Sequence, residues 1–356
     1  MKHLFKIYFF LFLQLTFLSN CEIFFEKKRK AEANKNRQLQ FLLALLATDT
    51  GALAAKIFYI NPLLKSNNPY NLAFVEEANS THVNPAKKKL ILVHGWDPDD
   101  RDSKLLSFSE QQGRVTTFGW KDFIDSGQFD AATTLDNFDV FGFDYLTSNP
   151  IDVNGSRFRA KMDSLFGNET GTVVIGAHSM GGLVSRFALY EGSQPAYIKR
   201  IITLGTPFHG SPWASPQFQA SKGEIGKIAA FMTDTNGGRD LAWDNFDGTI
   251  VGASNSKLTN INAQTTRDNL FYAFYGSVNN TGTRGSGGTV PGLYLACPVL
   301  GSSFAPSDCI VPATSARLDG NTLGNTPTDL GAYDHLDIKL LISSIRITFY
   351  NTLILP

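Results

Sequence analysis

The chain has 356 residues, of which 43% are apolar, a fraction that supports a sizeable buried core. Its 32 Lys and Arg residues balance 32 Asp and Glu residues, so the formal net charge is zero. This balance argues against a nucleic-acid partner and against a charged substrate steered by a long-range field.

The first residues form a predicted export signal. MKHLFK carries two lysines, and Ile7–Leu18 is a nearly unbroken apolar run. A run of about twelve residues is too short for the roughly twenty that span a bilayer as a mature helix. A positive start with a short apolar core is typical of a secretory signal peptide, so we expect one over residues 1–20. An uncleaved signal anchor is the alternative.

Cys21 follows directly, in the sequence LSNC. This stretch resembles the lipobox of bacterial lipoproteins, in which a small residue precedes a cysteine that becomes diacylated, although Asn20 departs from the usual Gly, Ala or Ser. The resemblance implies a lipid anchor on Cys21 that holds an exported protein at a membrane, periplasmic or at the cell surface. Residues 21–37 would then form a polar tether. The alternative is a secreted chain with an incidental cysteine.

The other two cysteines, Cys297 and Cys309, are an even pair in a chain that we expect to be exported. Such a pair favours a disulfide. Closing a loop of about a dozen residues would contribute roughly 3 kcal/mol by the chain-entropy estimate. Two free, buried thiols are the alternative.

Between residue 86 and the C-terminal region, apolar runs alternate with helical patterns, and we assign residues 38–356 to one domain. Strands are expected around Leu90–Val93, Val140–Tyr145, Val173–His178, within 197–207 and within 269–277, with helices from Ser156 and over Gly181–Tyr190. This alternation predicts an α/β fold, a mostly parallel sheet with helices on both faces. Continuously apolar strands fit a sheet that is covered on both sides.

Ser179 lies where the predicted strand ending at His178 turns into a helix. A tight turn there pushes the serine hydroxyl toward the carboxyl ends of the strands, where ligands bind in parallel sheets. Such a crowded turn needs small neighbours, and Ala177, Gly181 and Gly182 supply them. The N-terminus of the following helix points its positive dipole end at the serine.

These motifs resemble those of α/β-hydrolases, and specifically of bacterial triacylglycerol lipases. GAHSMGG is similar to their nucleophile elbow, LILVHGW to their oxyanion strand and TLGTPFHGS to the strand after the nucleophile helix. SDCIVPATS and YDHLD follow in the family's order, so the similarity covers roughly residues 88–340. Ala177 replaces the first glycine of the elbow motif. The resemblance implies an α/β-hydrolase fold and a lipase or esterase that cleaves carboxylic esters of lipids through an acyl-enzyme on Ser179, without a cofactor.

Chain order selects the general base. In this fold the serine is followed by the acid and then by the histidine, which points to His335. We expect His94 to make structural hydrogen bonds in the oxyanion loop and His178 to pack the elbow. His209 either lines the pocket or has a structural role.

The acid has four candidates, Asp308, Asp319, Asp329 and Asp334. We favour Asp308, because the following apolar residues can anchor its backbone and because it matches the acidic position of the lipase pattern. The resemblance also implies that the backbone N–H groups of Trp96 and Met180 form the oxyanion hole. Otherwise these two residues simply wall the pocket.

Residues 207–268 form an insertion that is too long for a simple crossover. Ile225–Met232 has helical spacing, and in lipases this region carries a lid; a crossover helix packed on the sheet is the alternative. Some related lipases bind calcium near the acid and the histidine. Asp337 matches one such position, but spacing places no second acidic ligand, so we predict no metal.

Two other functions stay open. One is a phospholipase or acyltransferase that uses the same triad. The other, from a different class, is a non-catalytic surface protein that binds its partner on a hydrolase scaffold. The presence of all three triad residue types argues against the second, and the oligomeric state is not predicted.

Overall fold

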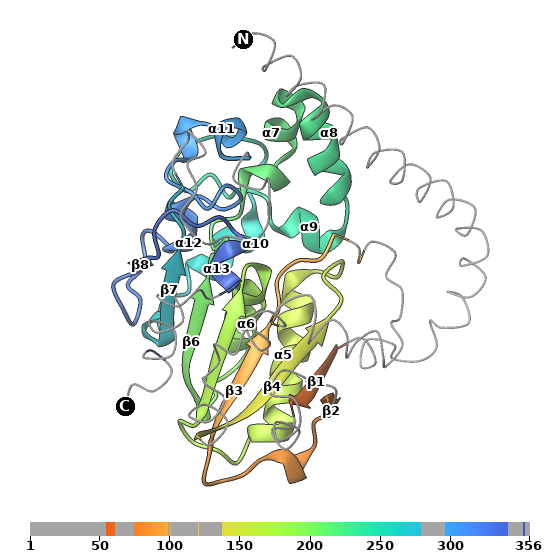
Figure 1. Ribbon diagram of the computed structural model, residues 1–356, viewed down its shortest axis with the longest axis vertical. Coiled ribbons are helices and arrows are strands. Elements are labelled where there is room, and N and C mark those ends of the chain that lie inside the picture. The colour runs from red at the N-terminus through yellow and green to blue at the C-terminus, as the bar shows by residue number, and fades with distance from the viewer. Residues whose placement is uncertain are drawn as a thin grey trace, which may run out of the picture. The chain divides into compact units, whose positions relative to one another are not determined.

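An eight-stranded sheet organises the part of the chain that the computed structural model describes, namely residues 55–60, 75–98, 100, 120, 137–278, 296–340 and 352 (Figure 1). All of these residues belong to one unit, Ala52–Pro356. The predicted signal peptide, Cys21 and the tether lie outside the described residues.

The strands are mostly parallel. They are β1 (Ala55–Ile60), β2 (Val75–Glu77), β3 (Lys88–Val93), β4 (Phe138–Tyr145), β5 (Val173–His178), β6 (Ile198–Leu204), β7 (Phe271–Tyr275) and β8 (Thr328–Asp329). Their order across the sheet is β2-β1-β4-β3-β5-β6-β7-β8. The pairs from β4 to β8 are parallel, whereas β1 runs antiparallel to β4 and to β2.

The α-helices of the described residues all come after β4 in the chain. They are α5 (Ile151–Phe166), α6 (Met180–Tyr190), α7 (Pro216–Ser221), α8 (Gly223–Met232), α9 (Asn236–Asp240), α10 (Ser256–Asn262), α11 (Ala296–Leu300), α12 (Ala313–Ala316) and α13 (Asp337–Leu340). Short 3-10 turns are η2 (Ser80–His82), η5 (Pro212–Ala214), η6 (Asp268–Leu270) and η8 (Ser302–Phe304). Helix α5 begins before the predicted Ser156, because Ile151 directly after Pro150 already faces the core.

Alternate residues of the central strands serve two separate cores. In β3, Ile91 and Val93 join the cluster under α5 and α6, whereas Leu90 and Leu92 join a second cluster with Trp120. This alternation is the period of two of an extended strand. It explains why the strand is apolar at each position from Leu90 to Val93, since both faces of the sheet are covered.

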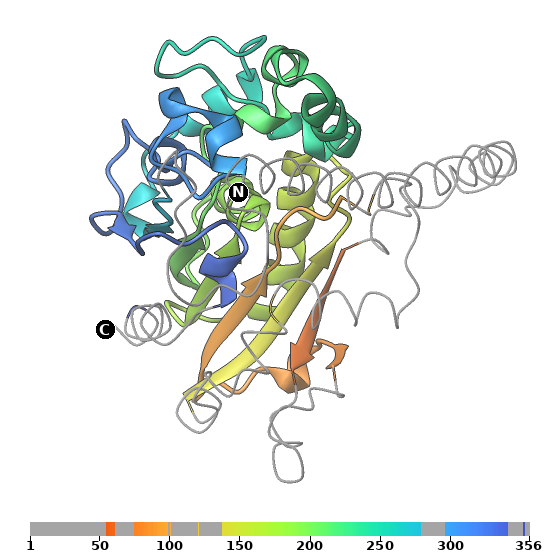
Figure 2. The same cartoon turned by 45° about the horizontal axis from the view of Figure 1, so that its top comes forward.

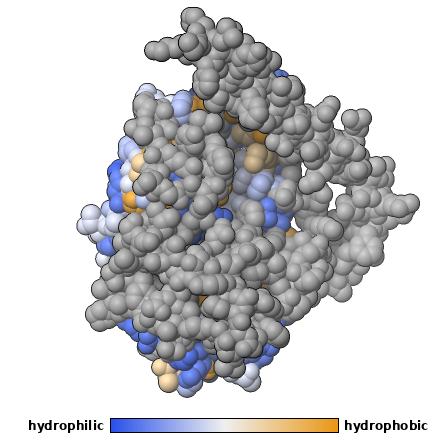
Figure 3. All heavy atoms as spheres, viewed as in Figure 1, coloured by the Kyte–Doolittle hydropathy of each residue, from blue (hydrophilic) through white to orange (hydrophobic). Residues whose placement is uncertain are grey.

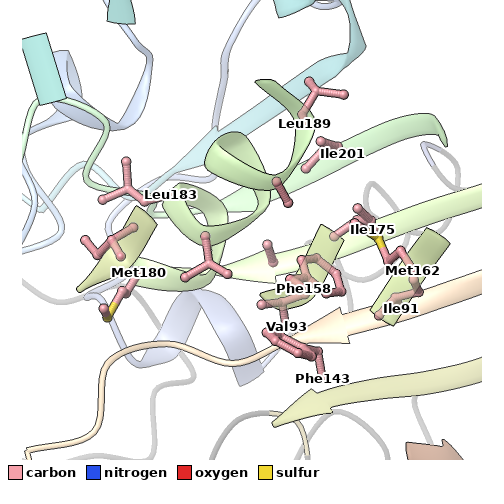
Figure 4. Packing of buried hydrophobic residues seen from close by; sticks show 14 of the residues in the cluster. Ile91, Val93, Phe143, Phe158, Met162, Ile175, Met180, Leu183, Leu189 and Ile201 are labelled. Carbon is pink, nitrogen blue, oxygen red and sulfur yellow. The ribbon is translucent and has the colours of Figure 1, made fainter. Parts of the chain in front are cut away.

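Helices α5 and α6 bury their apolar sides on the first face of the sheet, as Figure 4 shows. Phe143 of β4 stacks on Phe158 of α5 with ring centroids 4.3 Å apart. Burying a side chain of this size contributes about 1.5–3 kcal/mol. Helix α13 lies on the opposite side of the sheet (Figures 1 and 2).

The two ends of the sheet differ in what they carry. The turn that contains η2 has exposed polar residues, and hydrophilic surface predominates at that lower edge in Figure 3. The helices α7, α8 and α9 of the insertion gather at the other end, where β3 to β6 finish (Figure 2). This architecture is the α/β-hydrolase fold with an inserted helical region, as the sequence predicts.

Candidate active site

A strained turn holds Ser179 between β5 and α6. Its backbone has φ 53° and ψ −129°, a left-handed φ that a residue with a side chain rarely adopts. Such a conformation costs about 1–3 kcal/mol and persists only where the surrounding structure enforces it. The Ser179 N–H donates to the carbonyl of Leu204 on the neighbouring strand at 2.9 Å, which anchors the turn to the sheet.

Glycines around the turn leave no room for a side chain. A Cβ on Gly181 would lie 2.5 Å from the His94 carbonyl oxygen, and one on Gly182 would lie 1.9 Å from Thr206 Oγ1. A Cβ on Gly95 would lie 2.9 Å from Ser179 Cβ. The prediction that Gly181 and Gly182 must be small is therefore confirmed.

The structure brings Ser179, His335 and Asp308 together. His335 Nε2 lies 2.8 Å from Ser179 Oγ, and His335 Nδ1 lies 2.7 Å from Asp308 Oδ2. Because the carboxylate only accepts, Nδ1 carries the hydrogen and Nε2 is the nitrogen that accepts from the serine hydroxyl. The three side chains come from sequence positions far apart and meet at the carboxyl end of the sheet.

The carboxylate of Asp308 is fixed by its own backbone loop. Its Oδ1 accepts from the N–H groups of Ile310 at 3.1 Å and Val311 at 2.7 Å, which leaves Oδ2 for His335. The next residue, Cys309, forms a disulfide with Cys297. Asp308 is 1% exposed, so this hydrogen bond to the imidazole is shielded from water.

The other acidic candidates have different partners. Asp319 pairs with Arg317, and exposed Asp329 accepts from the N–H of Gly331. Asp334 is buried and accepts from two backbone N–H groups that follow it, while burial raises its pKa. The Nδ1 hydrogen bond of His335 goes to Asp308 instead.

Two further histidines have both ring nitrogens engaged in structural contacts. His94 Nδ1 lies 2.8 Å from the carbonyl of Gly95, and its Nε2 accepts from the N–H of Tyr145 at 3.4 Å. His209 Nδ1 lies 2.8 Å from Asp244, and its Nε2 faces the carbonyl of Asp319 at 3.0 Å. Neither ring has a nitrogen left to act as a base.

A set of hydrogen bonds that the sequence did not reveal holds the loop after β3, which carries Trp96. The hydroxyl of Tyr145 donates to the carbonyl of His94 at 2.8 Å. The hydroxyl of Thr147 accepts from the N–H of Asp97 at 3.0 Å, and the carboxylate of Asp100 accepts from the N–H of Thr147 at 2.8 Å. Contacts from the end of β4 thus fix the backbone around the predicted oxyanion donor.

Met180, the second predicted oxyanion residue, opens α6 and is fully buried. Its N–H lies at the helix N-terminus, where backbone donors have no partner within the helix. Helix α9 of the insertion approaches it closely, because a Cβ on Gly237 would lie 3.0 Å from Met180 Cε. The N–H of Gly237 also donates to the carbonyl of Ser148 at 3.1 Å.

Helix α8 includes the predicted lid segment Ile225–Met232. It packs against α7 and η5 through Gly226, where a Cβ would lie 1.7 Å from the Gln219 carbonyl oxygen. Gly226 is the one buried residue within α8, and Ile225 is 43% exposed. The alternative of a crossover helix with its apolar side buried on the sheet is therefore wrong.

Neither a metal centre nor a membrane-spanning helix is found among the described residues. In that part of the chain, no three His, Cys, Asp or Glu residues are grouped so that they could hold a metal ion. The same residues include no helix that is both long and apolar enough to cross a bilayer.

The comparisons with known proteins concern the serine segment and the overall fold. A family model described as "PGAP1-like alpha/beta domain" matches residues 160–224, a stretch that contains Ser179 but neither Asp308 nor His335. No curated protein sequence matches the chain.

Three solved structures illustrate the structural likeness. The mature lipase BlEst2 of Bacillus licheniformis is 20% identical, with 78% of this chain and 95% of that chain covered and a TM-score of 0.47. Lipase 1 from Pelosinus fermentans is 15% identical, with 77% and 100% covered and a TM-score of 0.44. Phospholipase PlaB from Legionella pneumophila is 15% identical, with 65% and 45% covered and a TM-score of 0.37.

Proposed function

We propose that this protein is a serine hydrolase that cleaves carboxylic esters of lipids through an acyl-enzyme on Ser179. The hydrogen-bond chain from Ser179 Oγ to His335 and on to Asp308, with distances of 2.8 and 2.7 Å, carries the proposal. A free serine hydroxyl is a weak nucleophile, and an adjacent base that is itself oriented by a carboxylate makes it a strong one.

In the first half of the reaction, Ser179 Oγ attacks the ester carbonyl carbon while His335 Nε2 takes the hydroxyl proton. Asp308 stabilises the imidazolium that forms. The carbonyl oxygen becomes an oxyanion, which the N–H groups of Met180 and Trp96 would stabilise. Collapse of this intermediate breaks the ester C–O bond, and the alcohol leaves with the proton from His335.

In the second half, water attacks the acyl-enzyme as His335 removes its proton. The tetrahedral intermediate then expels Ser179 Oγ, which regains a proton from His335, and the carboxylic acid is released. In an acyltransferase an alcohol takes the place of this water. The nature of the acyl acceptor therefore separates a hydrolase from an acyltransferase on the same three residues.

The choice of a lipid substrate rests on the insertion. Helix α8 carries apolar side chains that are half-buried or exposed, and α9 reaches Met180 next to the nucleophile. A contiguous exposed apolar patch marks a site for apolar ligands or interfaces, and we propose that the apolar residues of α8 form one. A lid over the serine would place this surface against the substrate.

A hydrolysis panel tests the proposal. Purified protein is offered nitrophenyl esters of increasing chain length, emulsified triglycerides and phospholipids, with Ser179→Ala as the matched control. We expect ester cleavage that Ser179→Ala abolishes. Cleavage of phospholipids alone, or acyl transfer to an added alcohol, would favour the phospholipase or acyltransferase; activity that survives in Ser179→Ala would contradict the acyl-enzyme on Ser179.

We also propose export and a lipid anchor on Cys21, which the LSNC sequence supports. Such an anchor would hold the enzyme at a membrane that contains its substrate class. Cys21→Ala should move the protein from the detergent extract into the soluble extracytoplasmic fraction. A mutant that is exported and still partitions with membranes would show that the anchor is elsewhere.

A further inference from the structure

His178 connects the nucleophile strand with the loop of the proposed base. It is the last residue of β5, directly before Ser179, and it is 4% exposed. Its Nε2 lies 2.9 Å from the backbone carbonyl oxygen of His335. A carbonyl oxygen only accepts, so His178 Nε2 carries a hydrogen and donates it.

This bond completes the fixation of His335. The His335 N–H donates to the carbonyl of Asp308 at 2.8 Å, and its ring bonds Asp308 and Ser179. The Nε2–H of His178 donates to the remaining polar atom of His335, its backbone carbonyl oxygen. Each of these four groups on His335 therefore has a partner whose position is set by the sheet or by the acid loop.

The loop that leads to His335 is otherwise held from the side of β7. Leu330 and Tyr333 are partly buried against the second core, and the Leu330 N–H donates to the carbonyl of Tyr275 at 2.8 Å. The hydrogen bond from His178 adds a direct link to β5, so it couples the imidazole position to the strand that presents the serine. A shift of about 1 Å in a reacting group is enough to cost about 10²-fold in rate.

His178 also remains uncharged beside the base. Burial lowers the pKa of His178 well below its usual value, and the neighbouring His335 and Lys339 lower it further. The two imidazole centroids are 4.8 Å apart, close enough for a charge on one ring to oppose a charge on the other. A neutral His178 leaves His335 free to become the imidazolium during the reaction.

We propose that His178 is a positioning residue, whose Nε2–H bond to the His335 carbonyl sets the distance between the imidazole of His335 and Ser179 Oγ. This inference rests on the proposed function. It differs from the expectation that His178 only packs the elbow, because packing depends on the volume of the side chain and positioning depends on its donor.

The experiment compares variants that separate volume from donor. His178→Leu fills similar space without a donor, and His178→Gln places an amide N–H near the position of Nε2. For His178→Leu we expect kcat to fall by about 10²-fold with KM little changed. The rate of Ser179 labelling by a fluorophosphonate should fall in parallel, and His178→Gln should restore most of both rates.

The matched control is His82→Leu, a histidine at the opposite end of the sheet in η2, which should leave both rates unchanged. If His178→Leu does not fold, His178→Asn replaces it, since its shorter amide cannot reach the carbonyl while its polarity equals that of Gln. Equal rates for Gln and Asn, or a folded Leu variant within about twofold of wild type, would overturn the inference. Failure of the wild type to label would instead overturn the proposed function.

Discussion

The nucleophile segment, β5 with α6, is almost entirely buried, whereas helix α8 of the insertion is not. All six residues of β5 and nine of the eleven residues of α6 are buried, whereas in α8 only Gly226 is. A reacting atom keeps its position when its neighbours leave no free volume. An apolar helix that is half-exposed has contacts left for another apolar surface. We infer that the carboxyl end of the sheet positions the catalytic groups and that the insertion contacts the substrate.

The largest loss of activity is expected from a change at Asp308, the proposed acid of the triad. Asp308→Asn can still accept from Ile310 and Val311, so the loop stays in place. Its amide nitrogen would then face His335 Nδ1 and favour the wrong tautomer, as in other triads, so kcat should fall by about 10⁴-fold. Steady-state kinetics alongside thermal melting measures this. Near-full activity in Asp308→Asn together with loss in Asp329→Asn or Asp334→Asn would move the acid elsewhere.

A substitution at Gly205 distinguishes backbone strain from displacement of the catalytic groups. It has φ +57°, and an added Cβ would lie 2.8 Å from Asp308 Oδ2 and 3.2 Å from His335 Nδ1. Gly205→Ala should lower kcat by about 10²-fold through displacement of that pair. Gly192→Ala is the matched control, with φ +64° and open space around the Cβ.

Gly192→Ala should lose about 1–2 kcal/mol of unfolding free energy, because it places a side chain at a left-handed φ. Gly205→Ala should lose more, because its Cβ would also lie 2.4 Å from Ile338 Cδ1. Only Gly205→Ala should lose activity. Equal kcat values for the two variants would show that the acid–base contact tolerates displacement.

A smaller loss of activity is expected from a change at Thr147, whose hydrogen bonds hold the loop that carries Trp96. Thr147→Val removes the hydroxyl that accepts from Asp97 N–H and lies 3.0 Å from Asp100, but it keeps the shape of the side chain. We expect kcat to fall by about tenfold with KM little changed. The loss of one hydroxyl should shift the loop by less than the roughly 1 Å that costs about 10²-fold in rate. Thr147→Ser, which keeps the hydroxyl, should retain activity; equal losses in Val and Ser would mean that the hydroxyl does not matter.

The smallest effect is expected on the insertion. If α8 is a lid, activity on an insoluble ester should rise sharply above its solubility limit, and Ile225→Ser should weaken that rise a few-fold. Hydrolysis of a short soluble ester should be unchanged, because Ile225 lies outside the packed site. Rates measured across the solubility limit for both proteins test this, and smooth saturation in the wild type would indicate a lidless esterase.

Local sequence patterns predicted most of the fold and the serine turn. Strands β3 to β7 are each rich in apolar residues, and the turn at Ser179 is marked by neighbours that have to be small. Strands β1 and β2 were missed, since β1 is defined by antiparallel pairing with β4, far along the chain. The short strand β8 pairs through two residues only and has no apolar run.

Long-range polar contacts could not be predicted in the same way. Thr147 and Asp100 are 47 residues apart, and His178 and His335 are 157 apart. No periodicity connects such positions, because the contacts exist only once the sheet has brought the strand ends together. Chain order alone made His335 the expected base, and the same order says nothing about its backbone carbonyl.

The site of covalent labelling shows directly whether Ser179 is an activated nucleophile. The wild-type protein is treated with a fluorophosphonate and digested, and the modified peptide is identified by mass spectrometry. We predict a single label on Ser179, lost in Ser179→Ala and strongly slowed in His335→Ala. A folded wild-type protein that takes up no label, or carries it on another residue, would contradict the assignment of Ser179 as an activated nucleophile.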